Sequence, residues 1–427
     1  MSSDSISPID GRYWPESRFL AGYFSERALM SERVRVELAY LRLLVRLKVA
    51  PKATVPPIEP SMAELKRLEG KLGHDVKAVE VFLREALKRS GRRELAPFVH
   101  LGLTSEDTNS LAFASLLRSA LESVMVPAYA SLASQLARIA RGEAHTAMTA
   151  RTHGRPAVPT TFGKEMAVFA VRIAERVSIL RTLTPMAKFS GAVGTYASFS
   201  VLGSRDWPAE LAKFVRSQGV EPVAYSTQVV PGERLSDILH LTININQLML
   251  SLSRDLWLYQ TLDYVHFRRK GKVSSSTMPQ KVNPVDLENS EGQVEVSNSL
   301  LLLLAYRLQL TRMQRDLSDS VIRRMLGQAL AHSLVATSRL RSALTSMKVE
   351  KKEMADDLRR HPEVYAEWEQ LSLRVRGDER GYEKVKAAIE KGSFNTGVRR
   401  PGTYLGEAEA LAERCPNVVR RFLGSSS

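Results

Sequence analysis

Residues 274–284, with the sequence SSSTMPQKVNP, are the stretch that decides the fold of this chain. Their adjacent hydroxyl side chains compete with the backbone for hydrogen bonds, and Pro279 has no N–H group to donate. The stretch is therefore predicted to be a loop. A helix is expected to begin at its far end, with Asn283 as N-cap, Pro284 as the first helical residue and Asp286 in the first turn.

This loop also has the features of an anion-binding site. Free N–H groups and the positive end of the helix dipole attract negative charge at a helix start, and Lys281 adds a positive side chain. Taken alone, the same composition is equally compatible with a solvated Ser/Thr linker. The interpretation therefore depends on the rest of the chain.

Helical patterns dominate the remaining sequence, and strand signals are scarce. Apolar residues recur at spacings of three and four over residues 160–180 and 234–264, and the second stretch has the pattern of a helix-bundle seam. Another helix is expected from Asn109, with a kink or break at Pro127. A last long helix is expected over residues 284–312. We therefore predict an all-α fold.

Three helical domains are predicted along the chain. An N-terminal domain is expected over residues 1–106, a central helix-bundle domain over 107–344 and a smaller C-terminal domain over 345–427. Residues 51–60 contain four prolines, which predicts a loop within the first domain.

The composition is that of an ordinary globular protein, with 427 residues, 44% hydrophobic and 25% charged. No uninterrupted apolar run approaches membrane-spanning length, so no membrane segment is expected. The single cysteine, Cys415, excludes an internal disulfide and fits a cytoplasmic location. No cysteine or histidine cluster has the spacing of metal ligands, so we expect no metal.

The formal net charge of +15 raises the alternative of nucleic-acid binding. The basic clusters are scattered along the chain and lack interleaved aromatic residues, whereas a nucleic-acid footprint gathers on one face. A basic field also attracts a small polyanionic substrate, which we consider the better interpretation. Salt-dependent binding to duplex or single strands would favour the alternative.

Two short motifs carry candidate chemistry. In residues 151–156, RTHGRP, the glycine and proline predict a turn that leaves His153 on an accessible corner, where it can exchange protons near neutral pH. Most isolated turn histidines are only structural. Thr104 and Asp107 have the spacing of a capping box at the start of the Asn109 helix, which is compatible with anion binding.

Further candidates lie on either side of these motifs. Ser320 and Arg324 are spaced to share one helix face, and Arg315 is expected to approach from the preceding turn. Guanidinium groups suit forked contacts with phosphate, although surface ion pairing is the usual role of such residues. His74, taken alone, is best interpreted as a surface or helix-start histidine.

Together these motifs resemble those of a known enzyme superfamily. The matching stretches resemble the fumarase/aspartase/argininosuccinate lyase superfamily and, within it, most closely the adenylosuccinate lyase family. They are PIDGRY at 8–13, HDVKAVE at 74–80, HLGLTSED at 100–107, RTHGRP at 151–156, YSTQ at 225–228, the loop continued through residue 292, and QRDLSDS at 314–320.

The resemblance implies an activity and a set of site residues. The reaction would be β-elimination of fumarate from adenylosuccinate, giving AMP, and from succinyl-aminoimidazole carboxamide ribotide. Ser275 matches the general base and His153 the general acid, with no cofactor. Substrate binding is implied for Arg12, Tyr13, His74, Asp75, Thr104, Ser105, Gln228, Lys281, Val282, Asn283, Arg315, Ser320 and Arg324, and a supporting role for His100, Thr152, Ser276 and Met278.

The resemblance also implies an assembly. Members of the family are homotetramers with composite active sites, and their central helices pool into one large bundle. We therefore expect the chain to assemble with copies of itself and to act on a polyanionic nucleotide.

Three positions depart from the family pattern. Ser274 replaces a usual glycine, Gln280 a common histidine, and Gly73 a polar residue before His74. Ser274 and Gln280 affect the expected opening and pH response of the loop, because serine stiffens a hinge and glutamine does not titrate. No function is assigned to residues 231–233, which also differ from the family.

Three rival functions stay open. Argininosuccinate lyase and fumarase share the signature loop, so the loop alone does not fix the substrate. The 8–13 motif and the set Arg315, Ser320 and Arg324 favour a substrate that carries phosphate. A catalytically silent relative would be expected to lack Ser275, His153 or Lys281, and all three are present.

Overall fold

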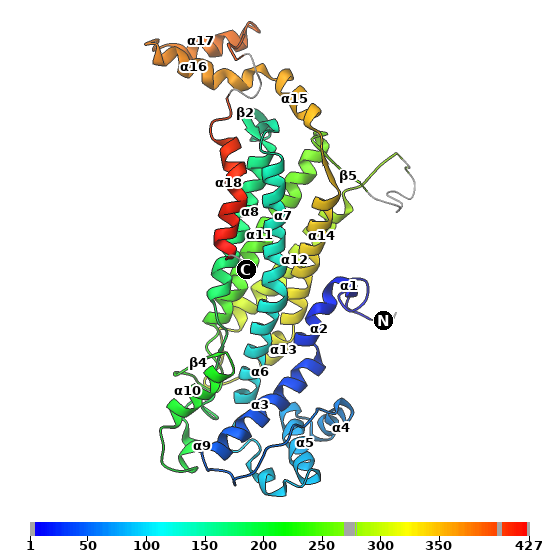
Figure 1. Cartoon of the computed structure of the whole chain (residues 1–427), viewed down its shortest axis with the longest axis vertical. Helices are drawn as coiled ribbons and strands as arrows, with labels where there is room; N and C mark the ends of the chain where they lie inside the picture. Colours follow the sequence, from blue (N-terminus) through cyan, green and yellow to red (C-terminus); the bar gives the residue numbers. More distant parts are fainter. Residues whose placement is uncertain (1–4, 269–277, 279, 399–403, 425–427) are drawn as a thin grey trace. The chain divides into compact units, whose positions relative to one another are not determined.

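A computed structural model describes residues 5–268, 278, 280–398 and 404–424 (Figure 1). About 66% of the described residues are helical, which confirms the prediction of a mainly helical fold. The chain divides into two compact units, each made of separate stretches. Unit 1 comprises Met1–Pro127, Ile179–Asn244 and Glu295–Val335, and unit 2 comprises Ala128–Ser178, Ile245–Val294 and Ala336–Ser427. This division does not test the predicted boundaries at residues 106 and 344, which stay a prediction.

Unit 1 contains the N-terminal helices and the segments that pack with them. Its elements are α1 (Trp14–Ser17), η1 (Arg18–Leu20), α2 (Ala21–Phe24), α3 (Glu26–Arg46), α4 (Met62–Leu72), α5 (Asp75–Arg89), η2 (Arg93–Phe98), α6 (Ser105–Ala120), the π turn η3 (Leu121–Met125), β3 (Met186–Ala187), α9 (Ala197–Ser200), α10 (Trp207–Ser217), β4 (Glu221–Pro222) and α13 (Ser318–Arg323).

Unit 2 contains the remaining short elements, and the long helices contribute to both units. Unit 2 holds β1 (Ala147–Thr152), β2 (Arg155–Thr161), β5 (Val265–Phe267), β6 (Met347–Val349), α15 (Lys351–Arg360), η4 (Pro362–Tyr365), α16 (Ala366–Val375), α17 (Gly381–Glu390) and α18 (Ala408–Leu423). The long helices are α7 (Val126–Gly142), α8 (Phe162–Thr182), α11 (Glu233–Thr261), α12 (Val285–Arg307) and α14 (Leu326–Ser346).

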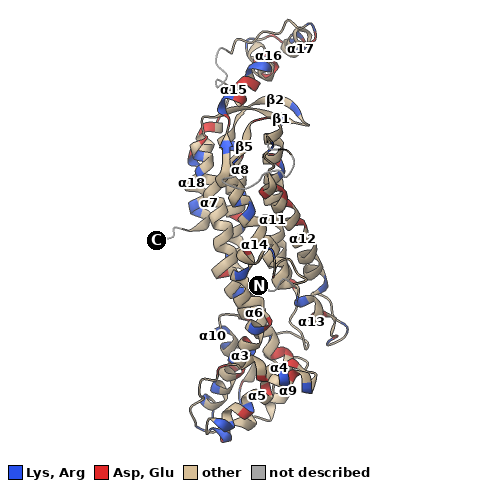
Figure 2. Ribbon diagram, turned by 90° about the vertical axis from the view of Figure 1, so that its right-hand side faces the viewer, with Lys and Arg blue, Asp and Glu red and all other residues tan. Residues whose placement is uncertain are grey.

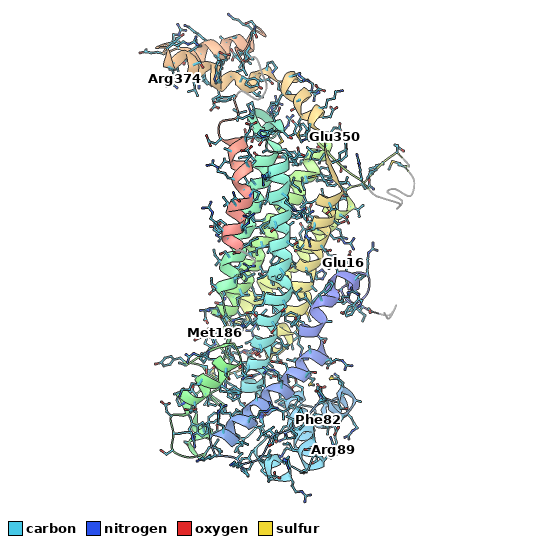
Figure 3. All side chains as sticks on the ribbon, viewed as in Figure 1. Glu16, Phe82, Arg89, Met186, Glu350 and Arg374 are labelled. Atoms are coloured by element: carbon cyan, nitrogen blue, oxygen red, sulfur yellow. The ribbon has the colours of Figure 1, made fainter. Side chains whose placement is uncertain are left out.

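The core of unit 1 is built from the apolar faces of α3, α5 and α6, with α10 packed beside them. Helix α5 shows the pattern: Phe82 is buried, whereas Arg89 lies outside (Figure 3). The Tyr40 ring is tilted against the Phe189 ring, with 5.3 Å between the ring centroids, and lies edge-on to the Phe214 ring at 6.1 Å. Such aromatic contacts stabilise a core beyond the area they bury.

The predicted long helices are present, with shifted ends. Helix α11 matches the predicted bundle-seam helix closely. Helix α8 begins at Phe162 rather than residue 160, because the two preceding threonines belong to β2. Helix α12 ends at Arg307 rather than near Arg312. Its start differs by one residue, because the Pro284 carbonyl accepts the first helical hydrogen bonds, from Leu287 at 2.9 Å and Glu288 at 3.2 Å.

The helix predicted from Asn109 begins earlier, at Ser105, and Pro127 does not break it. Instead, the five-residue π turn η3 directly precedes the helix that contains Pro127. Proline lacks an N–H donor and its ring crowds the carbonyl four residues before it. A π turn widens the helix at that point, so the chain continues without a break.

Three two-stranded sheets in the described part of the chain are the main difference from the all-α expectation. Strands β1 and β2 pair antiparallel, β3 and β4 pair parallel, and β5 and β6 pair antiparallel. All are short and connect helices. Residues 151–156 were predicted as a turn before a helix; the turn is present, but β2 intervenes before α8.

Charges of both signs are interspersed on the same helices, as Figure 2 shows. Examples are the ion pairs between Glu32 and Arg35 on α3 and between Glu85 and Lys88 on α5. Such mixing is typical of a solvated surface. In the described part of the chain, one helical stretch, Ser105–Gly142, is long and apolar enough to cross a membrane, and 56% of its most apolar window is buried in the protein. No long uninterrupted apolar run marks this stretch in the sequence.

Candidate active site

The predicted site residues of unit 1 begin at the N-terminus of α5. His74 is the N-cap, and its Nδ1 accepts a hydrogen bond from the Lys77 amide at 3.2 Å. The ring of a neutral His74 therefore carries its proton on Nε2. That nitrogen lies 3.5 Å from the Ser105 hydroxyl at the start of α6. The expected helix-start role of His74 is thus observed, and it brings two predicted binding residues together.

Asp75 joins this corner to two arginines. Its Oδ2 lies 2.8 Å from Arg33 Nη2 and 3.4 Å from Arg324 Nη2. Burial raises the pKa of Asp75, but the charges of Arg33 and Arg324 and the hydrogen bonds from Arg33 and the Val76 amide together outweigh burial, so the pKa lies below its ordinary value. The Arg33 guanidinium, which is buried, also donates from Nε to Asn109 at 2.8 Å. Asp75 is therefore an ionised carboxylate that positions arginines.

Arg315 is held by a buried carboxylate rather than by solvent. Glu106, on the first turn of α6, is only 1% exposed and lies 3.0 Å from Arg315 and 2.6 Å from Arg323. Burial raises the pKa of Glu106, but the charges of Arg323 and Arg315 outweigh burial and the pKa is lowered. Arg323 also pairs with Asp319 at 2.7 Å. This network fixes Arg315 close to Thr104 and Ser105.

The start of α6 is fixed from the other side by Asp107. Its carboxylate accepts the Thr104 amide at 2.8 Å, which is half of the predicted capping box. The same carboxylate accepts the amides of Ser190 and Gly191, and Lys188 Nζ lies 2.9 Å away with neither side chain exposed. Asp107 therefore ties the loop after β3 to the N-terminus of α6.

Gln228 lies against that loop. Its side-chain amide donates to the Ala192 carbonyl at 2.9 Å, and its backbone amide donates to Gln314 at 3.2 Å. Gly194 has φ +81°, and a Cβ there would meet the Ser226 carbonyl at 2.0 Å. Glycine therefore permits the close approach of the two segments.

Contacts in unit 1 thus link predicted residues from five separate stretches of the sequence. The linked residues are His74, Asp75, Thr104, Ser105, Gln228, Arg315 and Arg324.

Ser320 lies in the short helix α13, and Arg324 directly follows this helix with helical backbone angles. Helix α13 ends at Arg323, so Arg324 is its C-cap, and the Ser320 hydroxyl donates to the Leu317 carbonyl at 2.9 Å. The helix is six residues long because Asp316 and Ser318 close a turn in front of it, where the Ser318 amide donates to Asp316 at 2.9 Å. Arg315 was predicted to approach from the turn before the helix, and it lies directly in front of that turn.

The N-terminal motif lies beside the same cluster. Arg12 and Tyr13 follow a turn in which the Tyr13 amide donates to Pro8 at 2.9 Å. A cavity of roughly 430 Å³ is lined by Asp10 from this motif and by Arg324. Arg12 is exposed and Tyr13 half-buried. The motif therefore borders the arginine that Asp75 holds.

His100 has a structural position. Its φ is +61°, and its Nδ1 lies 2.7 Å from Glu37, which also accepts the Thr108 hydroxyl at 2.6 Å. Burial lowers the pKa of His100, but the hydrogen bond and charge of Glu37 outweigh burial and raise it. His100 therefore fixes the segment before α6 against α3, and its supporting role at the site stays a prediction.

His153 occupies the tip of a β-hairpin in unit 2. Thr152 ends β1, Arg155 begins β2, and the two residues between them, His153 and Gly154, have φ of +53° and +74°. Two positive φ values are those of a type I′ turn, which matches the twist of the flanking strands. His153 and Thr152 are exposed. The predicted accessible corner is therefore present at the turn between the paired strands β1 and β2.

Of the signature loop, Ser275 and Ser276 lie outside the described residues. Met278, Lys281 and Val282 are exposed, and Asn283 is half-buried. Asn283 lines a polar cavity of roughly 250 Å³ at the start of α12. There the Asp286 carboxylate accepts the Ser342 hydroxyl at 2.8 Å.

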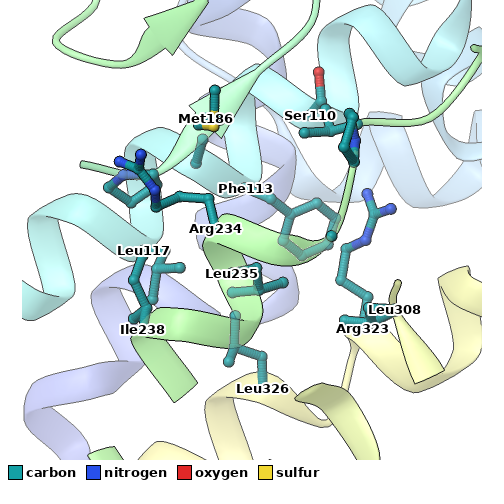
Figure 4. A pocket seen from close by; sticks show the side chains of 15 residues that line it. Ser110, Phe113, Leu117, Met186, Arg234, Leu235, Ile238, Leu308, Arg323 and Leu326 are labelled. Atoms are coloured by element: carbon teal, nitrogen blue, oxygen red, sulfur yellow. The ribbon is translucent and has the colours of Figure 1, made fainter. Parts of the chain in front are cut away.

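A separate pocket in unit 1 contains none of the predicted residues. It is lined mainly by apolar side chains, among them Leu117, Leu235 and Ile238, with Arg234 and Arg323 reaching into it (Figure 4). Arg323 also lies over the ring of Phe113, 5.3 Å from its centroid. Because its lining is largely apolar, this pocket does not suit a polyanionic substrate.

The charged residues that hold the site together were not predicted from the sequence. Arg33 and Glu37 are buried on the apolar face of α3, and Glu106 and Lys188 are likewise buried. Arg33 and Glu37 could have been recognised from the sequence, because each is a charged residue at a position where the helical pattern of α3 calls for an apolar one. Two glycines within residues 191–194 marked the loop next to Lys188. Within residues 5–268, 278, 280–398 and 404–424, no group of three or more His, Cys, Asp or Glu side chains has the arrangement of a metal site.

Comparisons with known proteins identify the family. Residues 59–296 match the family described as "Lyase", and residues 311–398 match "Adenylosuccinate lyase C-terminal". Adenylosuccinate lyase of Legionella pneumophila (strain Corby) is 36% identical over 404 residues, which cover 90% of this chain and 88% of the relative. That of Haemophilus influenzae (strain ATCC 51907 / DSM 11121 / KW20 / Rd) is 35% identical over 451 residues, covering 96% and 98%.

Solved structures agree on the fold. The 3-carboxy-cis,cis-muconate lactonizing enzyme from Pseudomonas putida superimposes with a TM-score of 0.81 at 21% identity, covering 98% of this chain and all of that one. A fumarate lyase from Mesorhizobium sp. BNC1 superimposes with a TM-score of 0.79 at 19% identity, covering 94% of this chain and 98% of that one. The sequence relatives and the matched family segments confirm the resemblance, and the chain belongs to the lyase family and, within it, to the adenylosuccinate lyases.

Proposed function

We propose that the chain catalyses β-elimination of fumarate from adenylosuccinate, giving AMP, and from succinyl-aminoimidazole carboxamide ribotide. The observation that carries the proposal is the linked cluster of predicted residues in unit 1. It combines hydroxyls and amides at the start of α6 with the guanidinium groups of Arg315 and Arg324. Such a set suits a ligand with several carboxylate or phosphate groups.

The binding roles follow from this chemistry. Thr104 and Ser105 lie at a helix N-terminus, where partial positive charge favours a carboxylate, so we assign them to the succinyl group. Arg324, next to the N-terminal motif of Arg12 and Tyr13, is assigned to phosphate. Glu106 and Asp75 hold the two arginines in place, which lowers the entropy lost when substrate binds.

His153 is assigned as the general acid. In the elimination, the bond between the succinyl carbon and the amine nitrogen breaks, and the nitrogen takes the proton that His153 gives up. Ser275, as its alkoxide, removes the proton from the neighbouring carbon, and the electron pair of that C–H bond forms the double bond of fumarate. Lys281 and Asn283 are assigned to the substrate carboxylate that stabilises the developing carbanion. The elimination itself needs no cofactor.

A homotetramer with composite sites is part of the proposal. Helix α12 carries exposed Val296, Leu303 and Tyr306 on one side, whereas Leu301 and Leu304 are buried. Exposed apolar side chains at these spacings mark a surface that packs against another protein. We assign that surface to other copies of the chain. A cytoplasmic location, which the single cysteine and the resemblance favour, stays a prediction.

The proposal is tested with purified protein and four substrates. Adenylosuccinate and the succinylated ribotide should lose absorbance as products form, whereas argininosuccinate and malate should not react. Conversion of either control substrate with no conversion of adenylosuccinate would overturn the proposal. Native mass measurement should give four chains per particle.

Two variants test the catalytic assignments. Ser275→Ala and His153→Asn should lower kcat roughly 10²-fold or more, because each removes a proton-transfer group. Asparagine is chosen at position 153 because it tolerates positive φ and preserves the hairpin turn. His145→Asn is the matched control, since His145 is exposed and pairs only at the surface with Glu409 and Glu413. Near wild-type turnover in either catalytic variant would reject that assignment.

A further inference from the structure

The hairpin that carries His153 is anchored by a buried carboxylate of the C-terminal region. Arg151, two residues before His153, reaches α15, where its Nη2 lies 2.9 Å from Asp357 Oδ2. The Tyr264 hydroxyl donates to the same oxygen at 2.5 Å. Asp357 therefore joins three parts of the chain: strand β1, the connection between α11 and β5, and helix α15.

The second oxygen of Asp357 is also engaged. Oδ1 lies 3.3 Å from Arg360 Nη2 and 3.5 Å from His361 Nε2. Asp357 is 5% exposed and Tyr264 only 1%. Burial raises the pKa of Asp357, but the hydrogen bond from Tyr264 and the charge of Arg151 outweigh it, so the pKa is lowered and the group is ionised at neutral pH.

The partners of Asp357 are themselves fixed by backbone contacts. Strand β5, which follows Tyr264, pairs with β6, which leads into α15. The Glu350 amide donates to the Tyr264 carbonyl at 2.9 Å, directly before α15 begins. Tyr264 and Asp357 therefore form a rigid support, whereas a two-stranded hairpin alone is marginally stable.

Packing alone does not require a charge at this place. The base of the hairpin also contacts apolar residues, since Ala147 packs on the cluster of Leu358, Val364 and Tyr365. A buried ion pair contributes little net stability compared with apolar residues of the same shape. Its directional contacts, however, specify one geometry, and here they act on the strand that ends one residue before His153.

We propose that Asp357 is a positioning residue for the reaction, which acts through Arg151 and Tyr264 to aim the hairpin and its His153 at the substrate nitrogen. This inference rests on the proposed role of His153 as the general acid. It assigns to the C-terminal region a function in proton transfer without substrate contact. A displacement of about 1 Å in a catalytic group can cost about 10²-fold in rate.

The first test compares two neighbouring aspartates of α15. In Asp357→Asn, an NH₂ group replaces one carboxylate oxygen and the negative charge is lost. An NH₂ group cannot accept a hydrogen bond from Arg151 or Tyr264, so the hairpin loses its anchor. We expect kcat to fall roughly 10- to 100-fold with KM changed less than about 2-fold, since binding groups are untouched. Asp356→Asn is the matched control, because Asp356 pairs with Arg359 at the surface, and it should keep wild-type kcat.

A double-mutant cycle separates positioning from general damage. In the His153→Asn background, Asp357→Asn should cause no further loss of kcat, because its effect passes through His153. An equal loss in both backgrounds, or a rise in KM in place of a fall in kcat, overturns the inference. Wild-type kcat in His153→Asn itself would instead overturn the proposed general acid, so the two failures are distinguishable.

A milder variant covers the case in which Asp357→Asn folds poorly. Tyr264→Phe removes only the hydroxyl donor and should lower kcat a few-fold in the wild-type background and not at all with His153→Asn. Thermal unfolding of each variant reports whether the chain is folded at the assay temperature. An unchanged kcat in Tyr264→Phe together with additive losses in the cycle would leave Asp357 with a structural role only.

Discussion

Lys188 and Asp107 form an ion pair inside unit 1, with 2.9 Å between Nζ and Oδ1 and no exposed side-chain surface. The pair connects the loop after β3 to the first turn of α6, where Thr104 and Ser105 lie. Both charges are compensated, since Asp107 also accepts backbone amides and Lys188 donates to the Gly191 carbonyl. Removing one partner leaves the other charge buried alone.

Lys188→Met should therefore destabilise the protein by about 3–5 kcal/mol, the usual cost of an uncompensated buried charge. Lys213→Met is the matched control. Lys213 pairs with Glu210 at the surface and is 70% exposed, so its loss should cost about 0–1 kcal/mol. Denaturant unfolding of both variants measures the difference, and equal costs would show that burial does not govern the pair.

Two glycine substitutions should have opposite signs. Gly194→Ala places a methyl group 2.0 Å from the Ser226 carbonyl at a positive φ, so it should destabilise the protein and raise KM by displacing Gln228. Gly70→Ala lies in α4 with nothing within 4 Å of the added Cβ, and it should stabilise by about 0.5–1 kcal/mol. Unfolding midpoints and substrate titrations check both, and a neutral Gly194→Ala would contradict the close approach.

Arg324→Gln should weaken substrate binding more than turnover. Loss of a charge-assisted hydrogen bond to phosphate is worth about 1.5–3 kcal/mol, or roughly a 10- to 150-fold rise in KM. Arg89→Gln, which removes a surface partner of Glu64, is the control and should leave KM unchanged. A fall in kcat at unaltered KM would place Arg324 in the chemical step rather than in binding.

The contact between His100 and Glu37 predicts a pH dependence of stability. The pKa of His100 is raised in the folded state, so the contact with Glu37 stabilises the folded protein most when His100 is protonated. This contribution to the free energy of unfolding is fully present below the ordinary histidine pKa of about 6.5 and is lost as the pH rises through the folded-state pKa. The stability difference between wild type and His100→Gln should therefore shrink from pH 6 to pH 9. Unfolding curves at intervals of one pH unit measure it, and a constant difference would refute the coupling.

Much of the architecture could be predicted from periodicity, and the site from short motifs. The bundle-seam pattern located α11 closely, since an amphipathic stripe reflects burial directly. The turn that exposes His153 was predicted correctly from the neighbouring Gly154. In contrast, Arg33 and Lys188 could not be assigned, because their partners lie 42 and 81 positions away in the chain (75 − 33 and 188 − 107) and become neighbours only in the folded state.

Local errors arose where tertiary contacts override sequence signals. Pro284 was predicted inside α12 but supplies the carbonyl that caps it, a shift of one residue that helix-start statistics do not resolve. Strand β2 was missed because it contains two prolines and is short, and its pairing with β1 stabilises it. Pro127 was predicted to kink or interrupt a helix, and the helix is not interrupted but continues through a π turn.

The π turn has a consequence for the spacing of sequence along this helix. It holds one more residue than a regular turn, so side chains beyond Met125 are rotated by about 100° relative to an uninterrupted α-helix. Deleting a single residue, such as Glu122, would restore regular winding and turn the buried stripe of α7, including Tyr129 and Leu136, away from the interior. The number of residues in this helix is therefore as constrained as their identity. Inserting or deleting one residue at the π turn should destabilise the protein far more than most point substitutions.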